Sequence, residues 1–153
     1  MTGKYYDELQ VGDILRHGRA RTITEAEHLL FSGMTQNTQP LHLDEEFARQ
    51  AGFEGRIVNG ILTLGLVIGI TVPDLTEGTI VANIGYQNIQ HPTPVYHGDT
   101  ISVESEVLEK RASESKSDRG IVRLRHLGRN QKGEVVIEVE RTVMFLTRPE
   151  GRK

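Results

Sequence analysis

The sequence predicts an α+β protein in which an antiparallel sheet curls around one central helix. Three observations lead to this fold class. Two helical patterns come early in the chain, an almost uncharged run follows from residue 61 to 72, and the second half is rich in strand patterns. A helix that is apolar on nearly every side is buried on nearly every side, so the strands that follow are expected to cover it.

Composition limits what the protein can be. A chain of 153 residues fits one domain, residues 1–153, with a substantial core. It has 18 basic and 21 acidic residues, so the charge does not indicate a nucleic-acid partner. The chain has no cysteine, which excludes disulfides and thiolate metal sites. The start of the chain is too polar for a signal peptide, and its longest apolar run falls short of the roughly 20 residues of a membrane span. We therefore expect a soluble, cytoplasmic protein without a membrane partner.

The first half reads as a strand followed by helices. Residues 16–23 favour a strand, and Thr24 with Glu27 forms a capping-box pattern for a helix from Glu25. The apolar positions of that helix fall on one face and are Ala26, Leu29, Leu30 and Met34. Residues 35–42 are expected to form a turn, because Pro40 disfavours helical geometry at the residue before it. A second helix is expected over 44–51, ending at Gly52.

The run Ile61–Val72 is the predicted buried helix, and Pro73 is expected to end it. Gly65 and Gly69 are four residues apart and share one face. Two glycines lower the stability of a helix, so we expect another backbone to pack very close to this face.

The second half is expected to supply about four antiparallel strands. Strand patterns cover residues 79–90, 101–107, 121–127 and 135–147, with a charged connection over 109–120 and a hairpin turn over 130–133. An open sheet of this kind has exposed edge strands, and pairing between two chains would cover one of them. A homodimer or higher homo-oligomer is the expected state.

The polar turn before the buried helix holds the candidate catalytic residues. His42 suits proton transfer, because histidine is the usual acid–base side chain of enzymes, whereas Asn37 can orient a water molecule but cannot act as a base. The amide of Gly60, at the start of the buried helix, is placed to bind an oxyanion. Each also has a purely structural interpretation: a hydrogen-bonded histidine, an ordinary turn asparagine, and a glycine needed for its backbone angles.

Other histidines do not indicate a metal site. His91 and His97 are six residues apart around a proline-rich segment, which is not a recognised zinc spacing. We expect neither a metal ion nor an organic cofactor.

Two segments carry a resemblance to a known family. The first joins Gln39-Pro40-Leu41-His42-Leu43-Asp44 to Arg56-Ile57-Val58-Asn59-Gly60, and the second is Pro94-Val95-Tyr96-His97-Gly98-Asp99-Thr100. Together they resemble the MaoC-like hydratase/dehydratase family, which includes the R-specific enoyl-CoA hydratases. The resemblance covers most of the chain and implies a hotdog fold, usually dimeric, and an acyl-CoA thioester as substrate.

The resemblance also implies roles for particular residues. His42 matches the catalytic histidine of the family, and Gly60 matches the glycine whose amide polarises the thioester carbonyl. The family's aspartate falls on Asn37, its asparagine on Gln39, and the histidine before its glycine on Asn59. Gln39, Asn59, Ile61 and Leu62 are the candidate substrate-binding residues. A subset of the family that acts on branched or dicarboxylic acyl-CoAs shares the Gln-Pro-Leu-His variant.

The expected activity is reversible addition of water across the 2,3-double bond of an enoyl-CoA, possibly a branched or dicarboxylic one. A hotdog thioesterase is one alternative, although residues 61–72 contain no carboxylate, which those enzymes commonly carry on this helix. A non-catalytic acyl-CoA-binding module is the other, because the motif aspartate is Asn37. Leu62, Leu66 and Ile68 are candidates for an acyl tunnel or simple core, and Arg56, Arg111 and Arg119 are candidate surface cations for the CoA phosphates.

Overall fold

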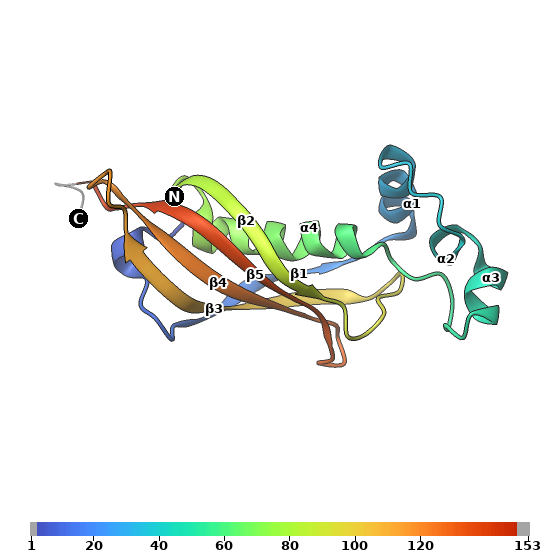
Figure 1. Ribbon diagram of the computed structural model, residues 1–153. Helices are drawn as coiled ribbons and strands as arrows, with labels where there is room; N and C mark the ends of the chain where they lie inside the picture. Colours follow the sequence, from blue (N-terminus) through green and yellow to red (C-terminus); the bar gives the residue numbers. More distant parts are fainter. Residues whose placement is uncertain (1–2, 150–153) are drawn as a thin grey trace.

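The structure is a computed structural model that describes residues 3–149. Its sheet has five antiparallel strands in the order β1-β3-β4-β5-β2 (Figure 1). The strands are β1 (Ile14–Thr22), β2 (Ile80–Gln90), β3 (Thr100–Ala112), β4 (Arg119–Arg129) and β5 (Val135–Leu146). The helical segments are η1 (Tyr6–Glu8), α1 (Glu25–Met34), α2 (Pro40–Leu43), α3 (Glu45–Gln50), α4 (Gly60–Thr71) and η2 (Val72–Thr76).

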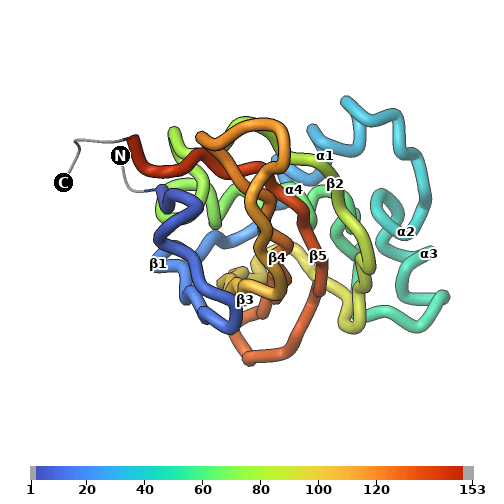
Figure 2. The backbone as a smooth tube through the Cα atoms, turned by 60° about the vertical axis from the view of Figure 1, so that its left-hand side comes forward, coloured from blue at the N-terminus to red at the C-terminus, as the bar shows by residue number. Residues whose placement is uncertain are grey.

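Helix α4 lies along the inner face of the curved sheet, as the sequence predicts (Figures 1 and 2). On β4 and β5 the buried side chains alternate with partly exposed ones, so each strand turns one face towards the helix. Val67, at the middle of α4, is fully buried in a cluster with residues of the strands, including Ile101, Val103 and Ile137. A second cluster, around Leu75, Leu124 and Phe145, fills the end of the sheet nearest η2. The sheet therefore covers the apolar surface of α4 from one side of the helix.

The short helices α1, α2 and α3 extend beyond the end of the sheet where α4 begins (Figure 1). Their ends are capped as the sequence indicates: Thr24 accepts from the Glu27 amide, and Asp44 accepts from the Phe47 amide at 3.0 Å. The guanidinium of Arg56 bonds to Glu25 of α1 and to Glu45 of α3. Arg56 thus links α1 to α3 through two ion pairs.

Several expectations about local structure are wrong, for identifiable reasons. His42 lies in a helical turn, because Pro40 occupies the first helical position, where a missing N–H costs nothing. The α-helix ends at Thr71, close to the expected end before Pro73, but the chain continues through Pro73 as the π-helical segment η2, which was not expected. The sheet has five strands and not about four, because the predicted strand at residues 16–23 joins it as β1.

The packing of two helices also differs from expectation. In α1 the buried residues are His28 and Ser32, whereas Leu30 and Met34 of the predicted apolar face are 65% and 74% exposed. In α4 no other backbone packs on Gly65 or Gly69, since a Cβ at either position would meet no heavy atom of the described chain within 4 Å. A groove of about 350 Å³ between α4 and β1 runs past both glycines. None of the helices within residues 3–149 is long and apolar enough to cross a membrane.

Alanine substitution is expected to have opposite effects on stability at a glycine that faces the core and at a glycine that faces the groove. A Cβ on Gly128 of β4 would lie 2.7 Å from Ile137 and 2.8 Å from Val67, so Gly128→Ala overfills the space under α4 and is expected to cost about 1–3 kcal/mol of unfolding free energy. Gly69→Ala meets open space on a helix and is expected to stabilise by up to about 1 kcal/mol. Urea unfolding of both variants tests this, and equal midpoints would contradict the packing described.

Candidate active site

The site is formed by the short helices α1 and α2, which extend beyond the sheet, and by the first turn of α4. His42 belongs to α2 and is half-buried. Its Nδ1–H donates to the backbone carbonyl of Ile57 at 2.7 Å. The amide of Ile57 in turn donates to the carbonyl of Leu41 at 3.0 Å, so α2 is fixed against the segment that leads to α4. Because a carbonyl can only accept, the proton of a neutral His42 stays on Nδ1 and the Nε2 lone pair is left to take a proton.

Gly60 is the first residue of α4, and its amide belongs to the unpaired N–H groups of a helix N-terminus. The side chain of Asn59 caps this end by accepting from the Ile61 amide at 2.9 Å. The ring of His91 lies against Gly60, and a Cβ there would be 2.9 Å from two of its atoms. A side chain at position 60 would displace the His91 ring, and the helix dipole makes the Gly60 amide suited to a developing negative charge.

His28 links these two parts and was not identified from the sequence. It is fully buried in α1, and its Nε2 accepts from the Asn59 amide at 2.9 Å. That bond places the proton of His28 on Nδ1, which donates to Nε2 of His97 at 2.7 Å. The ring of His28 also meets that of His42 edge-on, with 5.5 Å between centroids. His28 thus holds the peptide before Gly60 in place beside His42.

The protonation state of His28 follows from its surroundings. Burial, with smaller contributions from His97, His42 and Arg56, lowers the pKa of His28 to about 4. Burial also lowers the pKa of His97. Both rings are therefore neutral near pH 7, which the two hydrogen bonds of His28 require. In the sequence His28 is one polar residue before Leu29 and Leu30, and this pattern gives no sign of a role in the site.

The remaining predicted residues take different positions. Asn37 accepts from the Gln39 amide at 3.2 Å through its side-chain oxygen, which leaves its Nδ2 hydrogens for a water molecule. Gln39 is exposed, and Ile61 is 60% exposed beside Gly60. Leu62 is half-buried and packs against the core, while Asn59 is 3% exposed with its side chain occupied by the cap. The substrate contacts predicted for Gln39, Asn59, Ile61 and Leu62 stay predictions.

Of the candidate cations, Arg56 and Arg119 are already paired with carboxylates, Arg119 with Asp118 at 2.7 Å. A groove of about 400 Å³ next to the site is lined by Glu45, Glu54, Gly55, Arg56, Tyr96 and His97. It brings solvent to His97, at one side of the histidine cluster formed by His28, His42 and His97. Within residues 3–149, no group of three or more His, Asp or Glu side chains is arranged to hold a metal ion.

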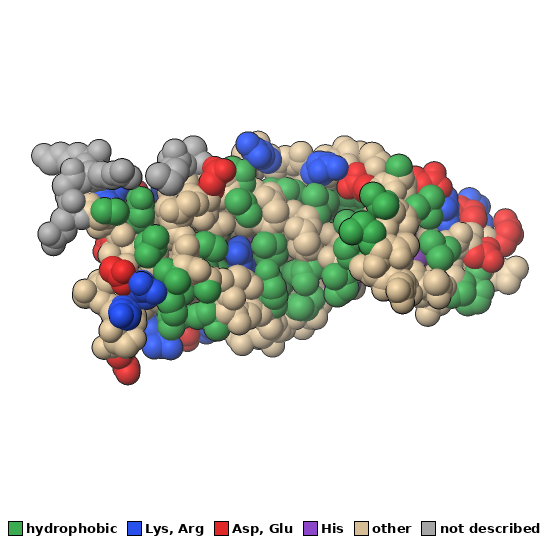
Figure 3. Space-filling model, turned by 90° about the horizontal axis from the view of Figure 1, so that it is seen from above, with side chains coloured by type: hydrophobic (Ala, Val, Ile, Leu, Met, Phe, Trp, Pro, Cys, Tyr) green, Lys and Arg blue, Asp and Glu red, His purple; other side chains and the backbone are tan. Residues whose placement is uncertain are grey.

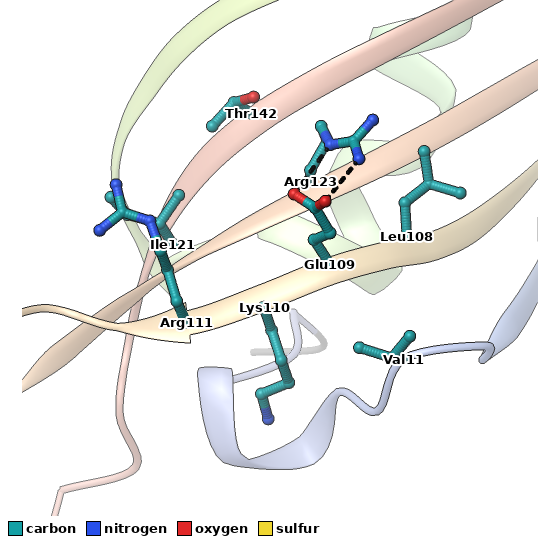
Figure 4. Close-up of a pocket in the computed structure, with 8 residues that line it drawn as sticks. All are labelled: Val11, Leu108, Glu109, Lys110, Arg111, Ile121, Arg123 and Thr142. Carbon is teal, nitrogen blue, oxygen red and sulfur yellow. Dashed lines mark hydrogen bonds and ion pairs between the residues drawn. The ribbon is translucent and has the colours of Figure 1, made fainter.

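A larger groove, of about 510 Å³, lies elsewhere on the molecule (Figure 4). Arg123 and Glu109 face each other across β3 and β4 there and form a two-point ion pair, with 2.8 Å between Nη2 and Oε1. Its lining side chains, which include Arg111 and Thr142, are all distinct from those of the histidine cluster. This groove is not part of the candidate active site.

A five-stranded antiparallel sheet wrapped around one helix is the hotdog architecture expected from the sequence. The family profile described as "MaoC like domain" matches residues 8–130. The chain belongs to the MaoC-like domain family. The family and the fold class expected from the sequence are thus confirmed.

Individual relatives agree with this assignment. The chain is 33% identical over 146 residues to a mesaconyl-CoA hydratase of Cereibacter sphaeroides, covering 95% of this chain and 42% of that protein. It is 30% identical to an (R)-specific enoyl-CoA hydratase of Rhodospirillum rubrum, covering 94% and 93% of the two chains. A solved protein of Mycobacterium tuberculosis described as a double hotdog fold superposes with a TM-score of 0.86 at 20% identity, covering 99% of this chain and 47% of that one. The chain spans about two fifths of the mesaconyl-CoA hydratase.

The depressed pKa of His28 makes a prediction about acid stability. A histidine whose folded pKa lies below its unfolded value of about 6.5 binds more protons when unfolded, so it withdraws stability as the pH falls from about 6.5 to about 4. His28→Gln keeps an acceptor for the Asn59 amide and removes the titration. Its unfolding free energy is expected to fall less between pH 7 and pH 5 than that of the wild type. Parallel pH profiles for the two proteins would show that His28 is not held neutral in the fold.

Proposed function

We propose that the protein is an enoyl-CoA hydratase, or equally a 3-hydroxyacyl-CoA dehydratase, acting on an acyl-CoA thioester. The observation that carries this function is the bond from His42 Nδ1 to the carbonyl of Ile57, three residues before Gly60 begins α4, which leaves Nε2 to act as a base. Two relatives that are named as hydratases of acyl-CoA thioesters support the proposal. Two predictions from the sequence stay open: that residues 1–153 form one domain of this kind, and that the protein is cytoplasmic.

The reaction follows from these positions. The thioester carbonyl accepts a hydrogen bond from the Gly60 amide, which stabilises the enolate as negative charge develops on the oxygen. His42 Nε2 takes a proton from water while the water oxygen bonds to the β-carbon, and the imidazolium then gives that proton to the α-carbon. Asn37 Nδ2 donates to the water and orients it. The net change is one water added across the double bond, and the reverse sequence eliminates it.

Substitution of His42 tests the proposal. His42→Asn keeps a donor for the Ile57 carbonyl but cannot take a proton, so hydration of enoyl-CoAs is expected to fall by about 10²–10⁴-fold with little change in unfolding free energy. His42→Ala should lose at least as much. Activity is followed as loss of the enoyl absorbance over a panel of straight, branched and dicarboxylic enoyl-CoAs. Full activity in His42→Ala would rule out this assignment.

The same panel separates the two alternatives. A thioesterase would release free CoA from saturated acyl-CoAs, and α4 carries no carboxylate to support that chemistry. An acyl-CoA-binding module would bind the panel without turnover by the wild type. In that case Asn37→Asp, which restores the carboxylate of the family pattern, is the variant in which hydration should emerge.

We further propose that two copies pair through β2 as a homodimer. This strand is an edge of the sheet, with β5 as its neighbour, and it exposes Val81, Ile84, Tyr86 and Ile89 by 40–52%. A long edge strand with exposed apolar side chains favours pairing with another chain. Figure 3 shows apolar side chains gathered on the face from which α4 and β2 are seen. The double hotdog relative, of which this chain covers 47%, supports such an arrangement.

A charge on the β2 edge tests the dimer. Ile84 is 52% exposed, so Ile84→Lys is expected to leave the fold intact and to shift the protein from dimer to monomer by burying a charge in the interface. Light scattering after gel filtration measures the mass. Val11→Lys, at a 59% exposed site before β1, is the control and should stay dimeric. A monomeric wild type, or a dimeric Ile84→Lys variant, would contradict pairing through β2.

A further inference from the structure

His91 lies against the start of α4 but carries no step of the proposed hydration. It follows directly after β2, and its ring turns the Nε2 end towards Gly60. A Cβ on Gly60 would lie 2.9 Å from both Nε2 and Cε1 of this ring and 3.4 Å from Cδ2. Within residues 3–149, no group forms a hydrogen bond or an ion pair with the ring. The polar edge of His91 is therefore unpartnered beside the residue that supplies the oxyanion amide.

A β-bulge in β2 turns His91 towards α4. Between Gln87 and Gln90 the register of β2 with β5 shifts by one residue. Asn88 takes up this irregularity with a φ of 53°, and its Nδ2 donates to Glu140 at 3.0 Å. Gln90 pairs with a glutamate of the outer face, so the next side chain, that of His91, points to the inner face on which α4 lies. Bulges are frequent next to active sites, where they re-aim a side chain.

His91 is neutral near pH 7 in this position. Burial lowers its pKa from the ordinary histidine value. The ring also lies at the positive end of the α4 dipole, which disfavours an imidazolium. A neutral imidazole has one N–H donor and one lone pair. With its proton on Nε2 the ring is a donor at the N-terminus of a helix, where a neutral histidine can polarise a carbonyl group.

One oxygen atom can reach both His91 and the Gly60 amide. The nitrogen of a residue and its Cβ position are about 2.5 Å apart, so Nε2 of His91 lies within about 5.4 Å of the Gly60 nitrogen. An oxygen that accepts two hydrogen bonds of about 2.9 Å can join donors up to about 5.8 Å apart. In a helix the Cα–Cβ bond tilts towards the N-terminus, so the ring lies on the side of Gly60 where the helix amides are open.

We propose that His91 is a second catalytic donor, which hydrogen-bonds through Nε2–H to the thioester oxygen held by the Gly60 amide. The enolate oxygen then accepts one bond from the backbone and one from a side chain as its negative charge develops. His91 keeps its proton throughout, so His42 remains the group that moves protons. This inference rests on the proposed function and adds a residue to it.

Substitution of His91 tests this role. His91→Phe keeps an aromatic ring but has no donor, so kcat for enoyl-CoA hydration is expected to fall by about 10²–10³-fold with little change in KM, as when one oxyanion donor is removed. His91→Gln carries a side-chain N–H and should lose less. Gln90→Phe, on the opposite face of the same strand, is the matched control and should keep the wild-type kcat. Thermal unfolding shows whether each variant folds, and His91→Leu serves if His91→Phe does not.

The carbonyl band of a bound thioester reports on the hydrogen bond itself. Butyryl-CoA has the thioester but no double bond, so it is not hydrated, and an isotope label at its carbonyl carbon makes the stretch visible by infrared difference spectroscopy. Binding to the wild type should shift this band to lower frequency. The shift should be smaller with His91→Phe than with His91→Gln or Gln90→Phe. A ring that only packs against Gly60 would leave the shift unchanged.

The outcomes separate this inference from the proposed function. An unchanged kcat in His91→Phe, a change in KM alone, or equal band shifts in the wild type and His91→Phe would overturn the second donor and leave the hydratase in place. If the wild type hydrates no enoyl-CoA, the proposed function fails, and the carbonyl band of butyryl-CoA decides the inference. A smaller shift in His91→Phe would then support the donor, and an equal shift, or no binding, would overturn it.

Discussion

The burial of α4 is the constraint on which the rest of the structure depends. Its twelve residues carry no charged side chain, so the helix is stable only where strands cover it. The five-stranded sheet does this from one side, with Val67 at the centre of the contact. Because the helix is fixed along its length, its first amide is fixed as well, and the overhanging helices can bring His42 and His28 to a defined point.

Much of this could be predicted from residues near one another in sequence. The apolar run, the capping residues and the alternation of the later strands indicated α4, α1 and the sheet, and the motif around His42 and Gly60 indicated the family. The role of His28 could not be predicted, because it depends on contacts with Asn59 and His97, which are 31 and 69 residues away. The start of α2 at Pro40 was missed because the same residue disfavours a helix before it and favours one after it.

The interior of the sheet combines two demands that usually exclude each other. The clusters on either side of Ser105 supply the apolar burial that holds the fold together, while a layer of buried side chains from His17 through Ser105 and His126 to Arg141 places polar groups in the same space. Alternation along β4 and β5 predicts which residues point inwards but treats Arg141 as an interruption of an apolar face. Only the three-dimensional arrangement shows that the interruptions on neighbouring strands lie side by side.

The partner of His42 has a consequence for how the site can change. In many enzymes a carboxylate side chain orients the histidine, and one substitution removes it. Here the orienting group is the main-chain carbonyl of Ile57, which every amino acid provides. Substitutions at position 57 can alter packing but cannot delete the acceptor. The course of the main chain therefore sets the tautomer of His42. Insertions, deletions or prolines between α3 and α4 would disrupt this tautomer more readily than side-chain replacements.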